Sequence, residues 1–176
     1  MICPSSGTHF HLRLLTELLR FASDVAISDA DFVAIKPIST LAFSAIMLWR
    51  DYCSWEVEHE AHSNGLKTIL LNAVPVLQKI HSINAAEAKR LLWTEIEKFE
   101  ARYCVARDNY IRDKAYDPEV IRWFGILELT IAGNALWSTT TARYNKRAKI
   151  PSREHSQTTL KTYEDKVTKP GYLIPY

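Results

Sequence analysis

Four polar residues at helical spacing are the first candidates for chemistry in this 176-residue sequence. Arg50, Ser54 and Glu58 follow one another at intervals of four residues, and Asp51 stands beside the first of them. On a helix this spacing puts the three side chains along one face. The oxygens of Ser54 and Glu58 are then spaced to share a hard cation such as magnesium, with Asp51 as a weaker candidate ligand. A solvent-exposed stripe of an ordinary helix has the same pattern, so spacing alone leaves both interpretations open.

A second group of candidates stands near the end of the apolar part of the chain. Trp137 and Tyr144 are seven residues apart, about two helical turns, and are expected to point the same way, with Arg143 beside them. An arginine at the edge of a pocket can hold a phosphate by paired charge-assisted hydrogen bonds, and an indole face can stabilise a carbocation. The alternative is a buried tryptophan and an arginine that caps the carboxyl end of a helix.

Both groups carry a resemblance to one enzyme family. The segment RDYCSWEVE, residues 50–58, resembles the Asn-Asp-x-x-Ser-x-x-x-Glu metal motif of class I terpene synthases. The segment GNALWSTTTARYN, residues 133–145, is similar to their C-terminal Trp-x5-Arg-Tyr element. The surrounding residues most resemble the cyclase domains of fungal bifunctional di- and sesterterpene synthases, over roughly residues 9–150. Two motifs in the right order favour the family more strongly than either motif does alone.

The resemblance implies a terpene cyclase, a carbon–oxygen lyase in which magnesium ions ionise a prenyl diphosphate and an aromatic-lined pocket folds the allylic cation. Metals and cationic side chains lower the barrier to loss of diphosphate, and a water-poor cavity protects the cation. By this resemblance Ser54 and Glu58 would ligate magnesium, while Arg143 and Tyr144 would bind the diphosphate. Trp137 would stabilise the cation. In relatives, a prenyltransferase domain is fused to the cyclase.

The sequence also departs from the family pattern. Arg50 stands where the family has a ligating asparagine, and a guanidinium has no acceptor to offer a metal. The aspartate-rich motif of an earlier helix is missing, so the chain is expected to be the C-terminal half of a cyclase, truncated or divergent. One hypothesis gives Arg50 a role: its guanidinium binds the diphosphate directly. The alternatives are a non-catalytic helical remnant that pairs with another chain and a plain helical interaction domain.

Composition predicts that these groups stand on an all-α fold. The chain has 47% hydrophobic residues but only 5 glycines and 7 prolines, which favours helices over a many-turned β architecture. Apolar periodicity and capping residues predict about five helices. The expected elements begin with a helix over 9–21, a capped turn at 28–31 and a long helix from Pro37 to 62. The next helix follows Gly65, is kinked at Pro75 and buries Leu66, Ile69, Leu70, Val74, Leu77 and Ile80. A helix over 84–111 then begins at Asn84 and Glu87, and a last helix begins at Asp117 and Pro118 and is apolar almost all round from 120 to 137.

Domain boundaries and location follow from composition. Residues 1–144 are predicted to form the partial cyclase domain, and residues 145–176 a basic, irregular and disordered tail or linker. A net charge of +2 gives no reason to expect nucleic acid as a partner. The longest weakly polar run, residues 37–49, is too short to cross a bilayer. Three widely spaced cysteines predict a reducing compartment, so a cytoplasmic location is expected.

Overall fold

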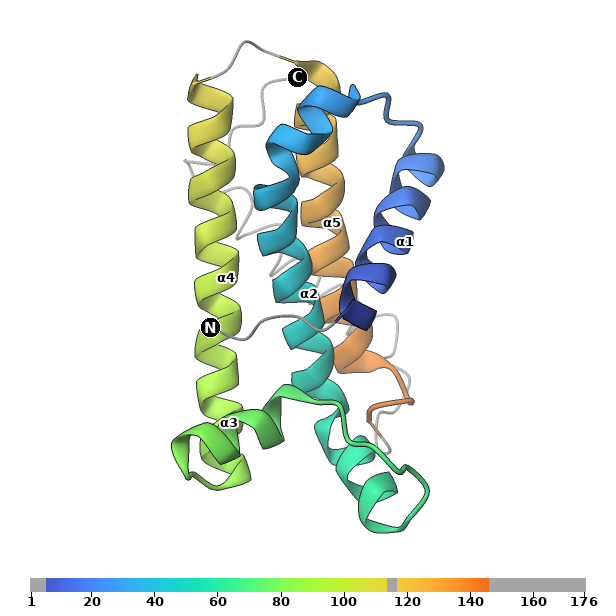
Figure 1. The fold of residues 1–176 in the computed structure, drawn as a ribbon, viewed down its shortest axis with the longest axis vertical. Helices are drawn as coiled ribbons and strands as arrows, with labels where there is room; N and C mark the ends of the chain where they lie inside the picture. The colour runs from blue at the N-terminus through green and yellow to red at the C-terminus, as the bar shows by residue number, and fades with distance from the viewer. Residues whose placement is uncertain (1–5, 114–116, 146–176) are drawn as a thin grey trace, which may run out of the picture.

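Five α-helices make up the computed structural model of this chain, which describes residues 6–113 and 117–145 (Figure 1). No strand occurs in these residues, so the all-α prediction with five helices is confirmed. The predicted tail lies outside the described residues except for Asn145. The helices are α1 (Ser6–Ser23), α2 (Asp29–Ser63), α3 (Ala73–His81), α4 (Ala85–Asp113) and α5 (Pro118–Thr140).

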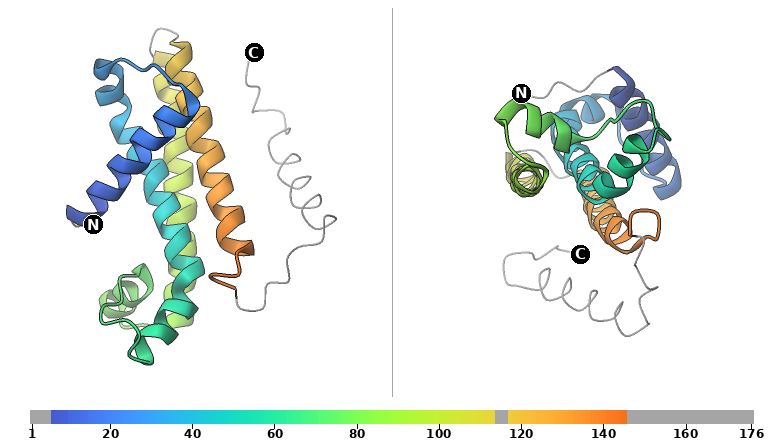
Figure 2. Two further views of the ribbon diagram at one scale, coloured as in Figure 1. Left: turned by 90° about the vertical axis from the view of Figure 1, so that its right-hand side faces the viewer. Right: turned by 90° about the horizontal axis from the view of Figure 1, so that it is seen from below.

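The long helix α2 is the centre of the bundle and packs against both α4 and α5. Helices α2 and α5 run in the same direction, and α4 runs in the opposite one (Figures 1 and 2). Two groups of buried apolar side chains hold the helices together, one along α2, α4 and α5 and one where α3 meets α2 and α4. The largest fully buried members are Trp123, Tyr103, Phe124, Ile35, Leu92, Ile96, Leu127 and Val74.

Helix α2 is longer than the sequence predicts. Ser28 caps it by accepting a hydrogen bond from the backbone N–H of Asp31. The predicted short turn and the predicted long helix are therefore one element, and Pro37 lies inside it rather than at its start. By length and mean hydropathy, 1.6 over an 18-residue window, α2 could also cross a membrane. The central helix of a helical bundle has the same length and hydropathy. The predicted absence of a membrane span therefore stays a prediction.

The kink predicted for α3 is wrong. The helix begins only at Ala73, so Pro75 falls in its first turn, where backbone N–H groups have no partner within the helix. Leu66 and Ile69 precede the helix and are exposed, and so is Ile80, whereas the expected burial of Val74 and Leu77 is confirmed.

Two predicted helix starts are confirmed. The backbone N–H of Asn84 donates to Glu87 Oε2 at 3.1 Å, and that of Glu87 donates to Asn84 Oδ1 at 3.0 Å, which is a reciprocal capping box before α4. Asp117 accepts from the N–H groups of Glu119 and Val120 and so caps α5, with Pro118 as the first helical residue.

The expectation that α5 is buried all round is wrong. Leu129 is 70% exposed, and Leu136 and Trp137 are 41% and 49% exposed. The opposite face of the helix carries Trp123, Phe124 and Leu127 into the core. Sequence hydrophobicity alone does not show that only part of this helix is covered.

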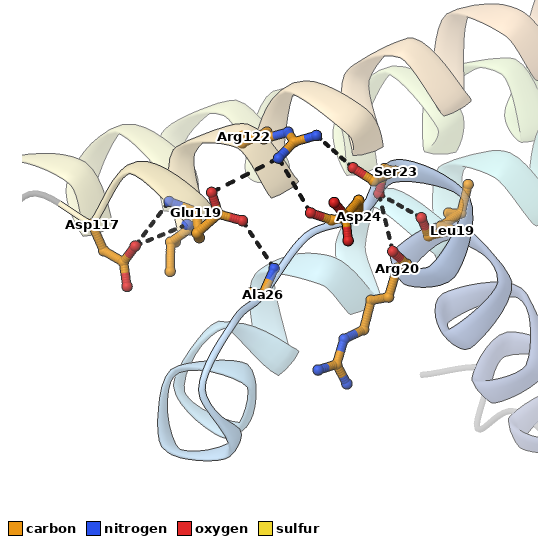
Figure 3. Close-up of polar contacts among 9 residues, drawn as sticks. Leu19, Arg20, Ser23, Asp24, Ala26, Asp117, Glu119 and Arg122 are labelled. Atoms are coloured by element: carbon orange, nitrogen blue, oxygen red, sulfur yellow. Dashed lines mark hydrogen bonds and ion pairs between the residues drawn. The ribbon is translucent and has the colours of Figure 1, made fainter.

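The connection between α1 and α2 is held to the first turns of α5 (Figure 3). Arg122 donates to the carbonyl oxygens of Ser23 and Asp24, at 2.6 and 3.2 Å. The backbone N–H of Ala26 donates to Glu119 Oε2 at 2.9 Å. These bonds lie at the end of the bundle opposite to both candidate groups.

Candidate functional site

The polar residues of α2 converge on Asn72, the residue just before α3. Ser54 is fully buried and Glu58 is 8% exposed. The Asn72 amide donates to the carbonyl oxygen of Asp51 at 2.9 Å, to Glu58 Oε2 at 3.3 Å and to Ser54 Oγ at 3.5 Å. Two of the side chains that sequence spacing singled out, and the backbone of a third residue, therefore belong to one network, although its centre is a residue that spacing did not suggest.

Asn72 and Asp51 together cap α3. Asn72 Oδ1 accepts from the N–H of Val74, and Asp51 Oδ2 accepts from the N–H of Ala73, both at 2.9 Å. The free N–H groups and the dipole at a helix start favour such acceptors. Burial raises the pKa of Asp51 to about 6, although the hydrogen bond from Ala73 and the charge of Arg50 lower it in part. Asn72 was missed as a site residue; its one sequence signal is that of a cap before an apolar helix.

Glu58 is paired with two cations. Its Oε1 atom lies 3.4 Å from Lys67 Nζ and 3.8 Å from Arg50 Nη2. The Glu58 side chain is 10% exposed, whereas those of Arg50 and Lys67 are 46% and 47% exposed. The chain after α2 turns back because the N–H groups of Leu66 and Lys67 both donate to the carbonyl oxygen of Ala61. This turn brings Lys67 to Glu58, and no helical spacing could have predicted it.

The residues of this cluster do not fit magnesium. The ion prefers about six oxygen ligands in octahedral geometry. Here Arg50 offers no acceptor, one oxygen of Glu58 faces two cations, and the other accepts from the Asn72 amide. In the part of the chain that the structure describes, no group of three or more His, Cys, Asp or Glu side chains is arranged to hold a metal. Metal binding by Ser54, Glu58 and Asp51 stays a prediction that these contacts do not support.

The second group gathers where α5 ends. The rings of Trp137 and Tyr144 meet edge to face with centroids 5.4 Å apart, and the Arg143 guanidinium carbon lies 5.8 Å from the Tyr144 ring centroid. The expectation that Trp137 and Tyr144 point the same way from one helix is wrong, although their rings meet. Helix α5 stops at Thr140, and the chain turns before Tyr144.

The carboxyl end of α5 is capped by Asn145 rather than by Arg143. The Asn145 amide donates to the carbonyl oxygens of Ser138, Thr139 and Thr141, at 3.0 to 3.2 Å. The side chain of Arg143 is exposed and lies against Tyr144. Ser138 is fully buried beside Trp137, and among the described residues its hydroxyl has no hydrogen-bond partner.

The two groups lie at the same end of the bundle. The Asn134 amide donates to the carbonyl oxygen of Ile46 at 3.2 Å, which joins α5 to α2 just before each helix reaches its group. Because the two helices run in the same direction, both groups lie beyond this contact, toward the lower end in Figure 1. Among the described residues, no hydrogen bond or ion pair joins Ser54 or Glu58 to Arg143 or Tyr144.

Comparison with known proteins identifies the family. No family model matches the chain. The chain is 32% identical over 138 residues to dolasta-1(15),8-diene synthase of Colletotrichum gloeosporioides, which covers 76% of the chain and 18% of that synthase. It is 30% identical to conidiogenone synthase of Penicillium rubens, over 77% of the chain and 19% of the synthase. It is 29% identical to a bifunctional sesterterpene synthase of Talaromyces wortmannii, over 73% and 17%.

The chain thus spans 17–19% of the length of these relatives. Their match covers about three quarters of the chain, and a diterpene synthase of Penicillium chrysogenum matches it to the same extent. The all-α fold agrees with the resemblance of both motifs. The chain belongs to the fungal terpene synthases, as a segment of their sequence.

Proposed function

We propose that this chain is a cyclase segment that helps to bind and ionise a prenyl diphosphate, the reaction of a carbon–oxygen lyase. The observation that carries this function is the arrangement of its cationic and aromatic groups. Arg50 stands in the second half of α2 and Lys67 just after its end, while Trp137, Arg143 and Tyr144 stand at the end of the neighbouring parallel helix α5. The names of its relatives include a diterpene and a sesterterpene synthase, which supports a long prenyl diphosphate as the substrate.

Each residue then has a chemical role. Arg143 and Tyr144 donate hydrogen bonds to the diphosphate, and Arg50 offers a second guanidinium. Positive charge around the leaving group lowers the barrier to cleavage of the C–O bond. Trp137 presents a half-exposed indole face that stabilises the allylic cation. The described residues do not fit magnesium, so we assign the neutralisation of the negatively charged diphosphate to side-chain cations.

A second function is a helical unit that acts only when packed against another part of the protein or a partner chain. Large apolar side chains at the surface favour it: Phe21 is 88% exposed, Leu129 70% and Val33 69%. In bifunctional relatives a fused prenyltransferase domain would deliver the substrate.

We place the protein in the cytoplasm, since Cys53 and Cys104 are both free thiols.

Product analysis tests the proposed function. The purified chain is incubated with geranyl, farnesyl, geranylgeranyl and geranylfarnesyl diphosphates, each with and without magnesium, and hydrocarbon products are analysed by gas chromatography and mass spectrometry. Cyclic products that R143A abolishes are expected from an active cyclase segment. If no substrate gives a product while the chain melts cooperatively, the second function is favoured.

A further inference from the structure

The Glu58 carboxylate lies where the family motif would bind a metal, yet its surroundings in this chain are positive. We propose that Arg50 and Lys67 exclude divalent metal ions from Glu58. At this position side-chain cations, rather than a metal ion, then supply the positive charge. The exclusion of metal concerns only contacts within the chain, whereas the role given to the side-chain cations rests on the proposed function.

Distance and burial support the exclusion. Lys67 Nζ and Arg50 Nη2 lie 3.4 and 3.8 Å from the same Glu58 oxygen. A magnesium ion on that oxygen, about 2.1 Å away, would lie within a few ångströms of both cations. Like charges repel more strongly where water is scarce, and the Glu58 side chain is only 10% exposed. The ion would have to displace at least one cation to bind.

Two further acceptors of the cluster already receive a hydrogen bond. The Asn72 amide takes Glu58 Oε2 and Ser54 Oγ, and its own oxygen caps α3 through the N–H of Val74. Rotation of Asn72 to release the two oxygens would therefore cost α3 one of its two capping hydrogen bonds. With Glu58 and Asp51 negative and both cations positive, the four charged side chains of the cluster sum to zero, so side-chain cations already balance its carboxylates.

Arg50 is the residue whose replacement should reverse this exclusion. R50N removes one positive charge and supplies an amide oxygen on the same helix face as Ser54 and Glu58. K67A removes the second charge from a loop position that is half exposed. The double variant R50N/K67A should therefore gain a divalent metal site that the natural chain lacks.

Manganese binding tests the inference, since Mn²⁺ accepts the same oxygen ligands and free Mn²⁺ is measured directly by electron paramagnetic resonance. Four proteins are titrated without any diphosphate: wild type, E58Q, R50N/K67A and R50N/K67A/E58Q. We expect the double variant to bind Mn²⁺ at least roughly tenfold more tightly than the wild type, and E58Q to remove that gain. Circular dichroism confirms that each protein is folded.

Two results would overturn the inference. One is saturable Mn²⁺ binding by the wild type that E58Q abolishes, because a metal would then bind despite both cations. The other is a folded double variant that binds no better than the wild type, because the cations would then not be what keeps the metal out. If the double variant does not fold, the Mn²⁺ affinities of the wild type, E58Q and K67A are compared instead. K67A should then bind Mn²⁺ more tightly than the wild type, and equal affinities would overturn the inference.

Discussion

At the scale of single residues, Asn72 does more for the structure than any residue that spacing pointed to. Its amide satisfies three acceptors on α2, and its oxygen caps α3. N72A would leave Ser54 and Glu58 without that donor and α3 without one of its two capping bonds, and should lower the free energy of unfolding by about 2–3 kcal/mol. Chemical denaturation measures the change.

The control for that variant is N109A. Asn109 is exposed on α4, and its side chain accepts a hydrogen bond from Arg112. Its loss should change stability by less than about 0.5 kcal/mol. Equal effects of the two substitutions would show that the Asn72 network contributes nothing beyond an ordinary surface amide.

Asp51 should make stability depend on pH. Its pKa is raised to about 6 in the folded chain, against 3.8 ordinarily, chiefly by burial. Between these values the folded state holds a proton that the unfolded state has released, so stability falls as pH rises from about 4 to 6. A shift of this size corresponds to at most about 3 kcal/mol. D51N removes the titrating group, and should therefore be more stable relative to wild type at pH 7 than at pH 4.

Urea denaturation at several pH values measures this difference for D51N and for a control, D113N. Asp113 has an exposed side chain at the end of α4, so D113N controls for the replacement of a surface aspartate by asparagine. A wild-type to D51N difference that does not vary between pH 4 and pH 7 would mean that Asp51 titrates normally.

Ser138 is expected to cost stability. Its hydroxyl is fully buried, and no described residue pairs with it, so the group is desolvated without compensation. S138A should raise the free energy of unfolding by about 1–2 kcal/mol. S44A is the matched control, since Ser44 donates to the carbonyl oxygen of Thr40 within α2 and its loss should bring only the helix preference of alanine, about 0.5 kcal/mol. A loss of stability in S138A would point to a hidden partner for this hydroxyl.

At the scale of elements, local signals in the sequence were sufficient wherever the cause is local. Two helix starts could be predicted, at Asn84 with Glu87 and at Asp117 with Pro118. Their capping hydrogen bonds join residues only two or three positions apart. The approach of Lys67 to Glu58 depends instead on how the chain turns after α2. The exposure of one face of α5 depends on which helices are present, and neither fact is encoded in spacing.

Pro37 and Pro75, which lie at different depths in their helices, give a test at this scale. Pro75 lies in the first turn of α3, where its missing N–H costs nothing, so P75A should change stability by less than about 0.5 kcal/mol. Pro37 lies well inside α2, where proline removes a helical hydrogen bond. P37A should therefore stabilise the chain, by up to about 3 kcal/mol. Thermal melting compares them, and a larger gain from P75A would contradict the placement of both prolines.

At the scale of the whole molecule, residues of both family motifs lie on an all-α fold, where their contacts differ from those that the motifs predict. The position of the metal motif is held by side-chain cations, and the Trp-x5-Arg-Tyr element keeps its aromatic contact at the neighbouring helix end. The chain spans 17–19% of the relatives it matches, and it exposes large apolar side chains on α1 and α5. Both observations favour a unit that works within a larger helical assembly.

The most direct test of this account is a calorimetric titration of the chain with inorganic diphosphate, without any metal. The proteins compared are wild type, R143A, R50A and the control R90A, whose arginine is exposed on α4. We predict that the wild type binds diphosphate, that R143A and R50A each weaken binding by roughly tenfold, and that R90A leaves it unchanged. Absence of binding by the folded wild type, or an equal loss in R90A, would contradict the assignment of the diphosphate to the cations at the ends of α2 and α5.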